Sequence, residues 1–378
     1  MGNVPNLRFP EFTEVWKVER LDEIATLSKG VGISKEQLSN DGEPCILYGE
    51  LYTKYKSEII KEIDSRTNID NSKLKRSKAN DVIIPCSGET AIDIATARCV
   101  PFDNILLGGD LNIISLYQYD GAFMSYQLNG KRKYDIAKVA QGVSVVHLYG
   151  EHLKAIFIYN PCLQEQQKIA QILSLLDERI ATQNKIIEDL KKLKSAISLK
   201  MLHSCSWEQF KIKDIATIGR GRVISSVEIS QQVNPTYPVY SSQTSNEGIM
   251  GYLDDYMFEG EYVSWTTDGA NAGTVFYRNG KFNCTNVCGL LKLRKGFDAH
   301  FVSLVLAEAT KKYVSINLAN PKLMNNTMGN IQIRLPNLEE QKRISIVFRK
   351  LQELLAMHNS LLNVYSMQKQ YLLSQMFI

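Results

Sequence analysis

Residues 16–30 read Trp-Lys-Val-Glu-Arg-Leu-Asp-Glu-Ile-Ala-Thr-Leu-Ser-Lys-Gly, and residues 207–221 read Trp-Glu-Gln-Phe-Lys-Ile-Lys-Asp-Ile-Ala-Thr-Ile-Gly-Arg-Gly. The tryptophan, the Ile-Ala-Thr tripeptide and the final glycine recur at one constant offset, and an Ile-Ser pair follows each copy. The chain is therefore duplicated. A duplicated chain can place two similar surfaces in one molecule, which suits a target that itself has two parts.

A second motif recurs at a shorter offset. Residues 156–166 (Ile-Phe-Ile-Tyr-Asn-Pro-Cys-Leu-Gln-Glu-Gln) match residues 331–341 (Ile-Gln-Ile-Arg-Leu-Pro-Asn-Leu-Glu-Glu-Gln). The first copy is therefore longer than the second between its two motifs. The chain is predicted to divide into a first variable module (1–155), a central helical segment (156–203), a second variable module (204–330) and a C-terminal helical segment (331–378).

Each second motif begins a long helix. Its proline fits a first helical turn, where the missing N–H would have no partner, and early glutamates suit the helix dipole. Apolar residues then follow spacings of four and three, from Ile169 to Met201 and from Ile344 to Met376, without proline or glycine. This pattern is typical of coiled-coil pairing and spans about 50 Å. The predicted core positions are Ile169, Leu173, Leu176, Ile180, Ile187, Leu190 and Ile197 in the first helix and Ile344, Phe348, Leu351, Leu355, Leu362, Tyr365 and Leu372 in the second.

Polar residues interrupt the pattern at the same two steps in both copies, at Gln183 and Lys194 and at His358 and Lys369. An antiparallel pair would place Gln183 beside Lys369, and Lys194 beside His358. Such polar pairs set the register of a coiled coil at some cost in stability. Two separate amphipathic helices, each packed on its own domain, are the alternative. Ordinary surface helices run about 8 to 20 residues, so the coiled coil is favoured.

The variable modules show a different residue pattern from the helical segments. Short β-rich runs such as residues 81–85 and 261–267 alternate with glycine and asparagine turns, and residues 301–307 read as a helix. The predicted fold class is therefore α+β (mixed α/β). We expect two similar globular domains, separated by a long antiparallel two-helix coiled coil and related by an internal pseudo-two-fold repeat.

Composition limits the class of protein. The 378 residues suffice for two to three domains, and 44% hydrophobic and 22% charged residues are ordinary for a globular protein. No run approaches the roughly 18 apolar residues of a membrane span, and a signal-peptide core is missing, so a cytoplasmic protein without membrane contact is expected. Seven cysteines include no Cys-x-x-Cys. Cys284 and Cys288 have no further ligands nearby in sequence, so no metal is predicted.

Sequence motifs for catalysis are missing. There is no phosphate-binding Gly-x-x-x-x-Gly-Lys-Ser/Thr loop and no Gly-x-Gly-x-x-Gly after a strand. Residues 160–163 (Asn-Pro-Cys-Leu) echo the Asn-Pro-Pro-Tyr motif of amino-methyltransferases but lack its aromatic residue, and a helix start explains them better. The five histidines form no evident catalytic triad. No catalytic residue is predicted.

Basic residues gather with small polar and aromatic neighbours in several loops. Lysines in such loops neutralise phosphates, and Arg, Asn and Gln read base edges. The net charge of +4 is weak for a protein that binds nucleic acid alone, so a partner would supply many phosphate contacts. The loop at 241–248 could read bases or be a plain connection. The candidate DNA-binding residues are Lys73, Arg76, Lys78, Ser87, Lys131, Arg132, Arg220, Arg222, Gln243, Asn246, Thr267, Asn271 and Arg278.

The order of these motifs resembles that of the DNA-specificity subunit of a type I restriction-modification enzyme. Two Trp…Ile-Ala-Thr…Gly segments are each followed by a module and by a Pro-x-Leu-x-Glu-Gln start of a heptad helix. Residues 6–12 and 262–277 are also similar to stretches of that family. Each motif is short, but their double occurrence in order is specific, and the resemblance covers the whole chain.

The resemblance implies two target-recognition domains, each reading one half of a split, asymmetric site in double-stranded DNA, with the coiled coil setting the distance between them. It implies two modification subunits as partners, which carry S-adenosylmethionine and methylate adenine at N6. It also implies restriction subunits that use ATP and Mg to translocate and cut DNA in phage defence. This chain would itself bind no cofactor and catalyse no reaction. A stand-alone DNA methyltransferase and a structural coiled-coil adaptor are the alternatives.

Overall fold

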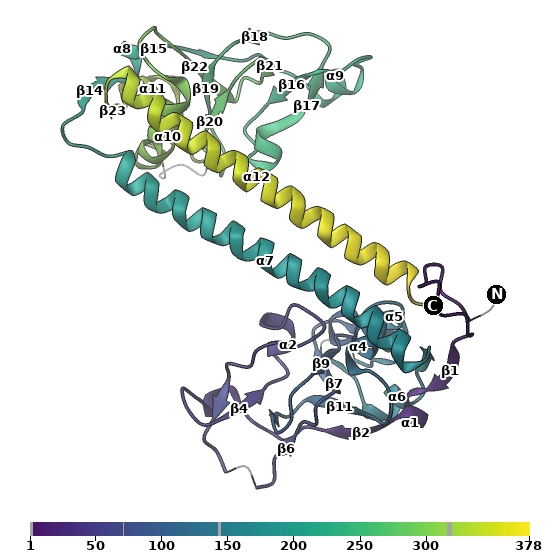
Figure 1. Ribbon diagram of the computed structural model, residues 1–378. Helices are drawn as coiled ribbons and strands as arrows, with labels where there is room; N and C mark the ends of the chain where they lie inside the picture. Colours follow the sequence, from purple (N-terminus) through teal and green to yellow (C-terminus); the bar gives the residue numbers. More distant parts are fainter. Residues whose placement is uncertain (1–2, 71, 143–144, 316–319) are drawn as a thin grey trace. The chain divides into compact units, whose positions relative to one another are not determined.

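Two long helices, α7 (Leu163–Met201) and α12 (Leu338–Gln375), each contribute to two compact units of the chain (Figure 1). The computed structural model describes residues 3–70, 72–142, 145–315 and 320–378. The first unit comprises residues 1–185 and 359–378, and the second comprises residues 186–358. Each unit therefore contains one globular domain and a part of both helices.

The first domain is built on an antiparallel sheet in the order β2-β11-β7-β9. These strands are β2 (Ala25–Lys29), β11 (Leu111–Leu116), β7 (Asp81–Pro85) and β9 (Arg98–Val100). A second sheet has the order β3-β5-β4-β10-β6, with β3 (Leu38–Ser39), β5 (Arg66–Thr67), β4 (Glu43–Ile46), β10 (Leu106–Leu107) and β6 (Lys75–Arg76). Two ribbons join β1 (Lys17–Arg20) to β13 (Phe157–Asn160) and β8 (Ser87–Gly88) to β12 (Val146–His147).

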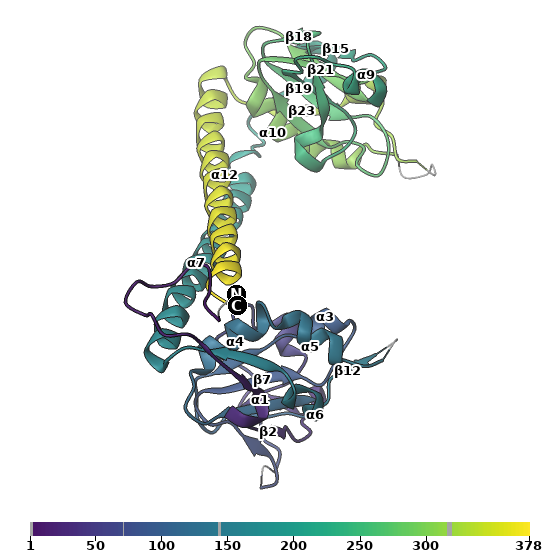
Figure 2. The same ribbon diagram turned by 90° about the vertical axis from the view of Figure 1, so that its right-hand side faces the viewer.

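Helix α4 connects this domain to the long helices (Figure 2). It begins after Asp120, whose carboxylate accepts a hydrogen bond from the backbone N of Phe123 at 2.7 Å, as a helix cap does. Phe123 and Tyr126 of α4 are fully buried and share an apolar cluster with Ile169 and Leu173 of α7. The helices of the domain are α1 (Leu21–Ile24), α2 (Glu50–Thr53), α3 (Ala91–Ile94), α4 (Gly121–Asn129), α5 (Lys133–Val139) and α6 (Gly150–Lys154), with the 3-10 turn η1 (Lys35–Gln37).

The second domain repeats this plan. Its antiparallel sheet has the order β15-β22-β19-β20, formed by β15 (Ala216–Arg220), β22 (Cys288–Leu293), β19 (Tyr262–Thr266) and β20 (Val275–Arg278). Its second sheet has the order β17-β16-β21-β18, formed by β17 (Ile249–Leu253), β16 (Tyr237–Tyr240), β21 (Lys281–Cys284) and β18 (Phe258–Glu259). A parallel strand pair occurs in the second sheet of both domains, β4 with β10 and β16 with β21. The ribbon joins β14 (Glu208–Lys211) to β23 (Gln332–Leu335).

Helix α10 occupies the place that α4 has in the first domain. It begins after Asp298, whose carboxylate accepts from the backbone N of Phe301 at 2.7 Å. Phe301 is fully buried in the main core, together with Trp265 of β19 and Phe348 of α12. The helices are α8 (Ile212–Ile215), α9 (Ser226–Ser230), α10 (Ala299–Ala309) and α11 (Asn325–Asn330), with the 3-10 turns η2 (Ser245–Gly248) and η3 (Thr310–Lys312).

Burial along α7 and α12 follows the predicted heptad positions. Every predicted apolar position is buried or half-buried, and most positions between them are exposed. The start of α7 packs with the end of α12 in the first unit, and the end of α7 packs with the start of α12 in the second, so the helices are antiparallel within each unit. The cluster members are Ile169, Leu173, Leu372 and Met376 in the first unit and Ile197, Met201, Ile344 and Phe348 in the second.

The predicted fold class of two similar mixed domains and a two-helix coiled coil is confirmed. Each predicted helical segment opens with a ribbon strand, β13 or β23, before the long helix begins. The four-part division of the chain at residues 155, 203 and 330 stays a prediction.

The predicted pairing of Lys369 with Gln183 is wrong. Lys369 Nζ lies 2.6 Å from Asp177 Oδ1 and 2.5 Å from Glu58 Oε2, and Asp177 also accepts from the Tyr126 hydroxyl at 2.7 Å. Lys369 therefore meets α7 nearly two turns away from the predicted partner. The buried carboxylates of Glu58 and Asp177 therefore determine where the Lys369 side chain lies. Burial raises the pKa of Glu58, although the charge of Lys369 opposes that rise. The pairing of Lys194 with His358 stays a prediction.

A buried glutamine joins each domain to its long helix. Gln166 Oε1 accepts from the backbone N of Asp120 at 2.9 Å, and its Nε2 donates to the carbonyl of Pro161 at 2.8 Å. The second copy repeats both contacts and both distances with Gln341, Asp298 and Pro336. Both glutamine side chains are 1% exposed. The last residue of the repeated Glu-Gln pair thus holds the cap of α4 or α10 against the start of α7 or α12.

Candidate nucleic-acid interface

The basic loop around β6 supplies exposed cations in the first domain. Lys73 and Lys78 are exposed, and both could contact phosphates. Arg76 is half-buried, because its guanidinium donates to Glu43 Oε2 at 2.6 Å and to the carbonyl of Asn104 at 3.1 Å. Its hydrogen bond to Glu43 raises the pKa of Arg76. This arginine is ion-paired in the free chain, so it must exchange a carboxylate for a phosphate in order to bind DNA.

The basic pair between α4 and α5 divides into an exposed and a structural residue. Lys131 is exposed. Arg132 instead donates to the carbonyl of Ile378 at 2.9 Å, lies 3.1 Å from Asp135 and covers the ring of Tyr159 at 5.1 Å. The bond to Ile378 holds the segment that follows α12 against the first domain. Lys131 is therefore the accessible member of the pair.

Two predicted residues follow equivalent strands, β7 and β19. Ser87 is half-buried, and its hydroxyl lies 3.4 Å from Asp110 Oδ2. Thr267 is 1% exposed, and both its backbone N and its hydroxyl donate to the carbonyl of Val287 at 3.0 Å. Thr267 therefore shapes the loop after β19, and a DNA contact by Thr267 stays a prediction. Asn271 in the same loop is exposed, and its carbonyl accepts from the hydroxyl of Thr274 at 2.8 Å.

Arg220 at the end of β15 and Arg222 just after it are held by the second domain. Arg220 donates to Asn325 Oδ1 at 2.8 Å. Arg222 is exposed and ion-paired with Glu228, and this hydrogen bond raises the pKa of Arg222. A surface ion pair of this kind is worth about 0–1 kcal/mol, so a phosphate can replace the carboxylate at little cost.

The polar loop at 241–248 has a constrained backbone. Asn246 (φ 48°, ψ 44°) and Glu247 (φ 52°, ψ 25°) are both left-handed, and Gly248 follows with φ 85°. Consecutive non-glycine residues in this region are uncommon and strained. The Gln243 side chain donates to the carbonyl of Ile249 and so supports the loop from within. The side chains of residues 244–247 are exposed at its tip.

Arg278 supports this loop from below. Its side chain is 4% exposed, lies 3.6 Å from the ring centroid of Tyr240 and donates to the carbonyl of Glu247 at 2.7 Å and to Ser264 Oγ at 3.0 Å. Burial lowers the pKa of this guanidinium, and the nearby Tyr240 opposes that change. Arg278 is therefore a positioning residue for the loop, and a direct DNA contact by Arg278 stays a prediction.

The candidate DNA-binding residues thus differ in how accessible their side chains are. Five predicted residues are exposed, and their side chains make no hydrogen bond or ion pair with the described residues; they are Lys73, Lys78, Lys131, Asn246 and Asn271. The sequence interpretation missed the buried network of Glu58, Arg98 and Asp177 around Lys369. A charged residue beside a heptad position, such as Asp177 after Leu176, is the only signal in the sequence that could have indicated it.

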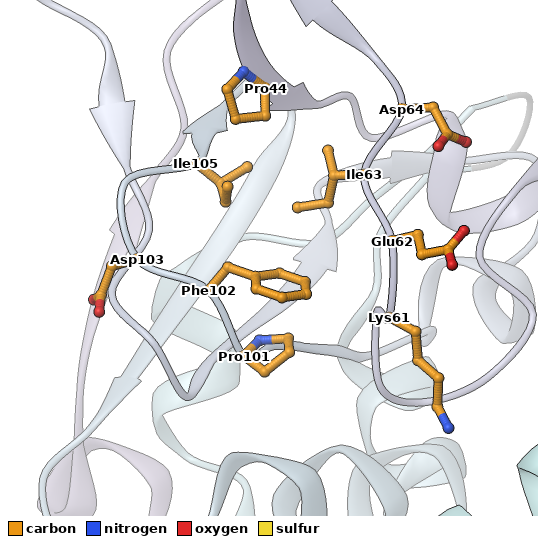
Figure 3. A pocket seen from close by; sticks show the side chains of 9 residues that line it. All are labelled: Pro44, Lys61, Glu62, Ile63, Asp64, Pro101, Phe102, Asp103 and Ile105. Carbon is orange, nitrogen blue, oxygen red and sulfur yellow. The ribbon is translucent and has the colours of Figure 1, made fainter.

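One surface depression of the first domain is poorly suited to DNA. It has a volume of about 700 Å³, and Figure 3 shows its apolar floor with Phe102 and Ile63. Three carboxylates, those of Glu62, Asp64 and Asp103, lie around it with a single cation, Lys61. This excess of negative charge would repel a phosphate backbone.

Within the described ranges, no cluster of three or more His, Cys, Asp or Glu side chains is arranged to hold a metal ion. Cys284 and Cys288 are buried free thiols. The Cys284 thiol lies 3.3 Å from the carbonyl of Cys288. The helices that the structure describes include none that is both long and apolar enough to cross a membrane.

Comparisons with known proteins place the chain in a family. The family model described as type I restriction modification DNA specificity domain matches residues 13–192 and again residues 205–364. A Mycoplasma pneumoniae protein provisionally named as the N-terminus of a type I specificity subunit is 46% identical over 140 residues, which are 36% of this chain and 74% of that protein. The specificity subunit of the type I restriction enzyme MpnII from the same organism is 42% identical over 140 residues, which are 37% of this chain and 42% of that protein.

A solved structure has the same fold. The crystal structure of the S subunit of a type I restriction-modification system from M. genitalium superposes with a TM-score of 0.74, at 18% identity, over 99% of both chains. The chain belongs to the type I restriction-modification DNA specificity family and carries two copies of its domain. This confirms the family that the sequence motifs predicted.

Proposed function

We propose that this chain is the DNA-specificity subunit of a type I restriction-modification complex, in which each domain reads one half of a bipartite site in double-stranded DNA. The observation that carries the proposal is a duplicated scaffold with unlike loops. The sheets β2-β11-β7-β9 and β15-β22-β19-β20 have the same order, and both domains use the same capped helix and the same buried glutamine. The exposed loop residues differ between the two domains, which would let each domain recognise its own bases.

The catalytic work is assigned to partners. Two modification subunits would carry S-adenosylmethionine and methylate adenine, and restriction subunits would use ATP and Mg to translocate and cut. This chain would act as the non-catalytic recognition subunit in the cytoplasm, where the DNA lies. The small net charge of +4 supports this division, because a chain with so little excess charge needs partners to help hold the phosphate backbone.

The two long helices would set the spacing between the half-sites. Half-sites read from one face of B-DNA lie about 34–36 Å apart. The two helices have 39 and 38 residues. At about 1.5 Å per residue they are long enough to hold two recognition domains at that separation.

Mapping methylated adenines by single-molecule sequencing, with and without this gene, tests the function. We expect one bipartite motif to lose its methylation when the gene is removed. Inserting one heptad into both helices should lengthen the unspecified spacer of that motif and leave the bases of both halves unchanged. A motif with its original spacer would refute the role of the helices.

The two alternatives make different predictions. A purified chain that methylates DNA without partners would favour a stand-alone methyltransferase. A complex that retains DNA without any sequence preference would favour a structural adaptor.

A further inference from the structure

A cavity lies at the start of α7, on the first unit. It has a volume of about 780 Å³ and is lined by the N-terminal arm (residues 8–15), the ribbon β1–β13 and the first turn of α7. Its charged lining residues are four carboxylates, of Glu11, Glu14, Glu19 and Glu165, and two cations, of Arg8 and Lys17. Arg8 is ion-paired with Glu165 at 2.7 Å, and Glu11 is ion-paired with Lys168. Glu14 and Glu19 then remain against Lys17, so the wall keeps an excess of one negative charge.

Three polar side chains on this wall form a fixed network. The Tyr119 hydroxyl donates to Glu19, 2.9 Å from each carboxylate oxygen, and Asn160 Nδ2 donates to Glu19 Oε2 at 3.0 Å. Burial, together with the bond to Glu19, raises the pKa of Tyr119 to about 12, so its hydroxyl keeps its proton. Because a carboxylate only accepts hydrogen bonds, Asn160 must turn its nitrogen toward Glu19.

Asn160 Oδ1 is the remaining polar atom of this network, and it has no partner among the described residues. Asn160 is 2% exposed and lines the cavity, and its Oδ1 accepts no hydrogen bond from any described residue. A buried acceptor without a donor is destabilising, because it loses its hydrogen bond to water and gains none in the protein. The network is therefore incomplete in the free chain.

The second copy of the scaffold has apolar side chains at the same three positions. Phe210 stands for Glu19 in β14, Leu335 stands for Asn160 in β23, and Phe297 stands for Tyr119 before the cap of α10. The ribbon registers are equivalent, with Lys17 opposite Asn160 and Glu208 opposite Leu335. Phe210 and Phe297 pack edge to face with centroids 5.3 Å apart.

The second domain indicates that the three polar residues serve a purpose other than folding. The same ribbon, cap and helix start form with an aromatic and aliphatic trio, so the scaffold does not require the polar one. Well-packed apolar residues are often as stabilising as a buried polar network, or more so. A polar trio with an unsatisfied acceptor therefore indicates a ligand that completes it.

We propose that this cavity binds an arginine or lysine side chain from a modification subunit. Such a side chain carries only donors and a positive charge, which match the carboxylate of Glu19 and the excess negative charge of the wall. Asn160 Oδ1 is itself buried, so the Asn160 side chain must turn toward the cavity before that oxygen can accept from the ligand. The proposal rests on the proposed function, which supplies the partner. The second unit offers an apolar surface at this place, so two identical partners bind to unlike sites, and only one of the two contacts is sensitive to salt.

The test uses the full chain and the modification subunit of the same system. Glu19→Gln removes the charge but keeps the shape, and the new amide can donate to Asn160 Oδ1 after that side chain turns. The combined variant Glu19→Phe, Tyr119→Phe, Asn160→Leu copies the second unit. Both should melt at or above the temperature of the unchanged chain. Titration calorimetry at two salt concentrations should show one of the two binding steps weakened about 10- to 100-fold, as loss of a charged hydrogen bond implies, and no longer dependent on salt.

Phe297→Tyr is the matched control in the second unit and should leave both steps unchanged. Unaltered binding by Glu19→Gln and by the combined variant would overturn the assignment, whereas failure of the unchanged chain to bind any modification subunit would remove the proposed function itself. A separate titration with L-argininamide distinguishes the source of the cation. If L-argininamide stabilises the unchanged chain but not the combined variant, while both bind the subunit equally well, the cavity binds a free small-molecule cation. The proposed contact with the partner is then wrong.

Discussion

Asn246 is the residue at which strain and exposure coincide. Its backbone is left-handed, its side chain is exposed, and the buried Arg278 holds the next carbonyl in place. Strain of this kind persists where the surroundings impose it, which is common at recognition sites. Asparagine is also the side chain that pairs with an adenine edge through two hydrogen bonds. We therefore expect Asn246 to read a base within the half-site of the second domain.

Asn246→Gly tests this role, because glycine adopts the left-handed region without cost. The melting temperature should stay the same or rise, yet the half-site of the second domain should lose selectivity at one base pair, by about 1–3 kcal/mol. Methylation mapping of the assembled complex measures the change. Glu247→Gly is the control, since it relieves the same strain in the same loop and should keep the motif. Equal motifs for both variants would contradict a reading role for Asn246.

His300 predicts a dependence of stability on pH in the second unit. It is 2% exposed, and its ring nitrogens lie 3.1 Å from Ser345 Oγ and 3.3 Å from Gln352 Oε1. Burial lowers its pKa below the ordinary value of 6.5. The unfolded chain then takes up a proton first as the pH falls. The stabilising contribution is complete above pH 6.5 and is lost as the pH falls toward the folded pKa.

Hydrogen exchange of α10 between pH 8 and pH 5 measures this effect, with a slope of at most about 1.4 kcal/mol per pH unit. The variant His300→Gln keeps a donor and an acceptor but cannot titrate, so its slope should be smaller. His147→Gln, at an exposed position of the first unit, should leave the slope of α10 unchanged. A slope that His300→Gln fails to reduce would rule out this histidine as its source.

At the scale of elements, the joint between each domain and its helix depends on one glutamine. Gln166→Ala leaves the backbone N of Asp120 and the carbonyl of Pro161 without their partner. Each unsatisfied buried group costs about 1–3 kcal/mol. We expect α4 to lose protection in hydrogen exchange while α10 keeps it, and Gln341→Ala to do the reverse. If either variant loosened both helices equally, the two joints would not be independent.

The long helices were predictable because their signal is local. Heptad spacing without proline or glycine fixes the buried face, and every predicted position is buried or half-buried. The register was not predictable, because it depends on partners far away in sequence. Lys369 finds Glu58 and Asp177, which are 311 and 192 residues distant.

The candidate site was predictable only in part. A basic or polar residue type indicates a possible DNA contact, but it does not reveal burial. Arg132, Thr267 and Arg278 fit the pattern as well as Lys73 does, yet each of them donates to a carbonyl or hydroxyl oxygen of its own unit. The constrained backbone of Asn246 comes from Arg278, which belongs to a separate strand, β20, and bonds to the carbonyl that follows Asn246.

For the whole molecule, the duplicated plan predicts that the domains are separable readers. Replacing residues 1–155 by the corresponding module of another family member should change one half of the methylated motif and leave the other half and the spacer unchanged. Methylation mapping in a host that lacks its own system measures this. The reciprocal exchange of residues 204–330 should change the other half. Altered bases in both halves after one exchange would contradict independent reading.

The glutamine joint has a consequence for how such chains diversify. Within the part of the chain that the structure describes, the side chains of Gln166 and Gln341 bond to main-chain atoms of the module and of the helix start. A main-chain atom is the same whatever side chains surround it, so the joint tolerates almost any reader that presents a capped helix in the right place. Gene recombination within the repeated segments can therefore bring in a foreign module with its attachment already matched. We expect new DNA targets to arise in this way by shuffling, without a gradual redesign of the scaffold.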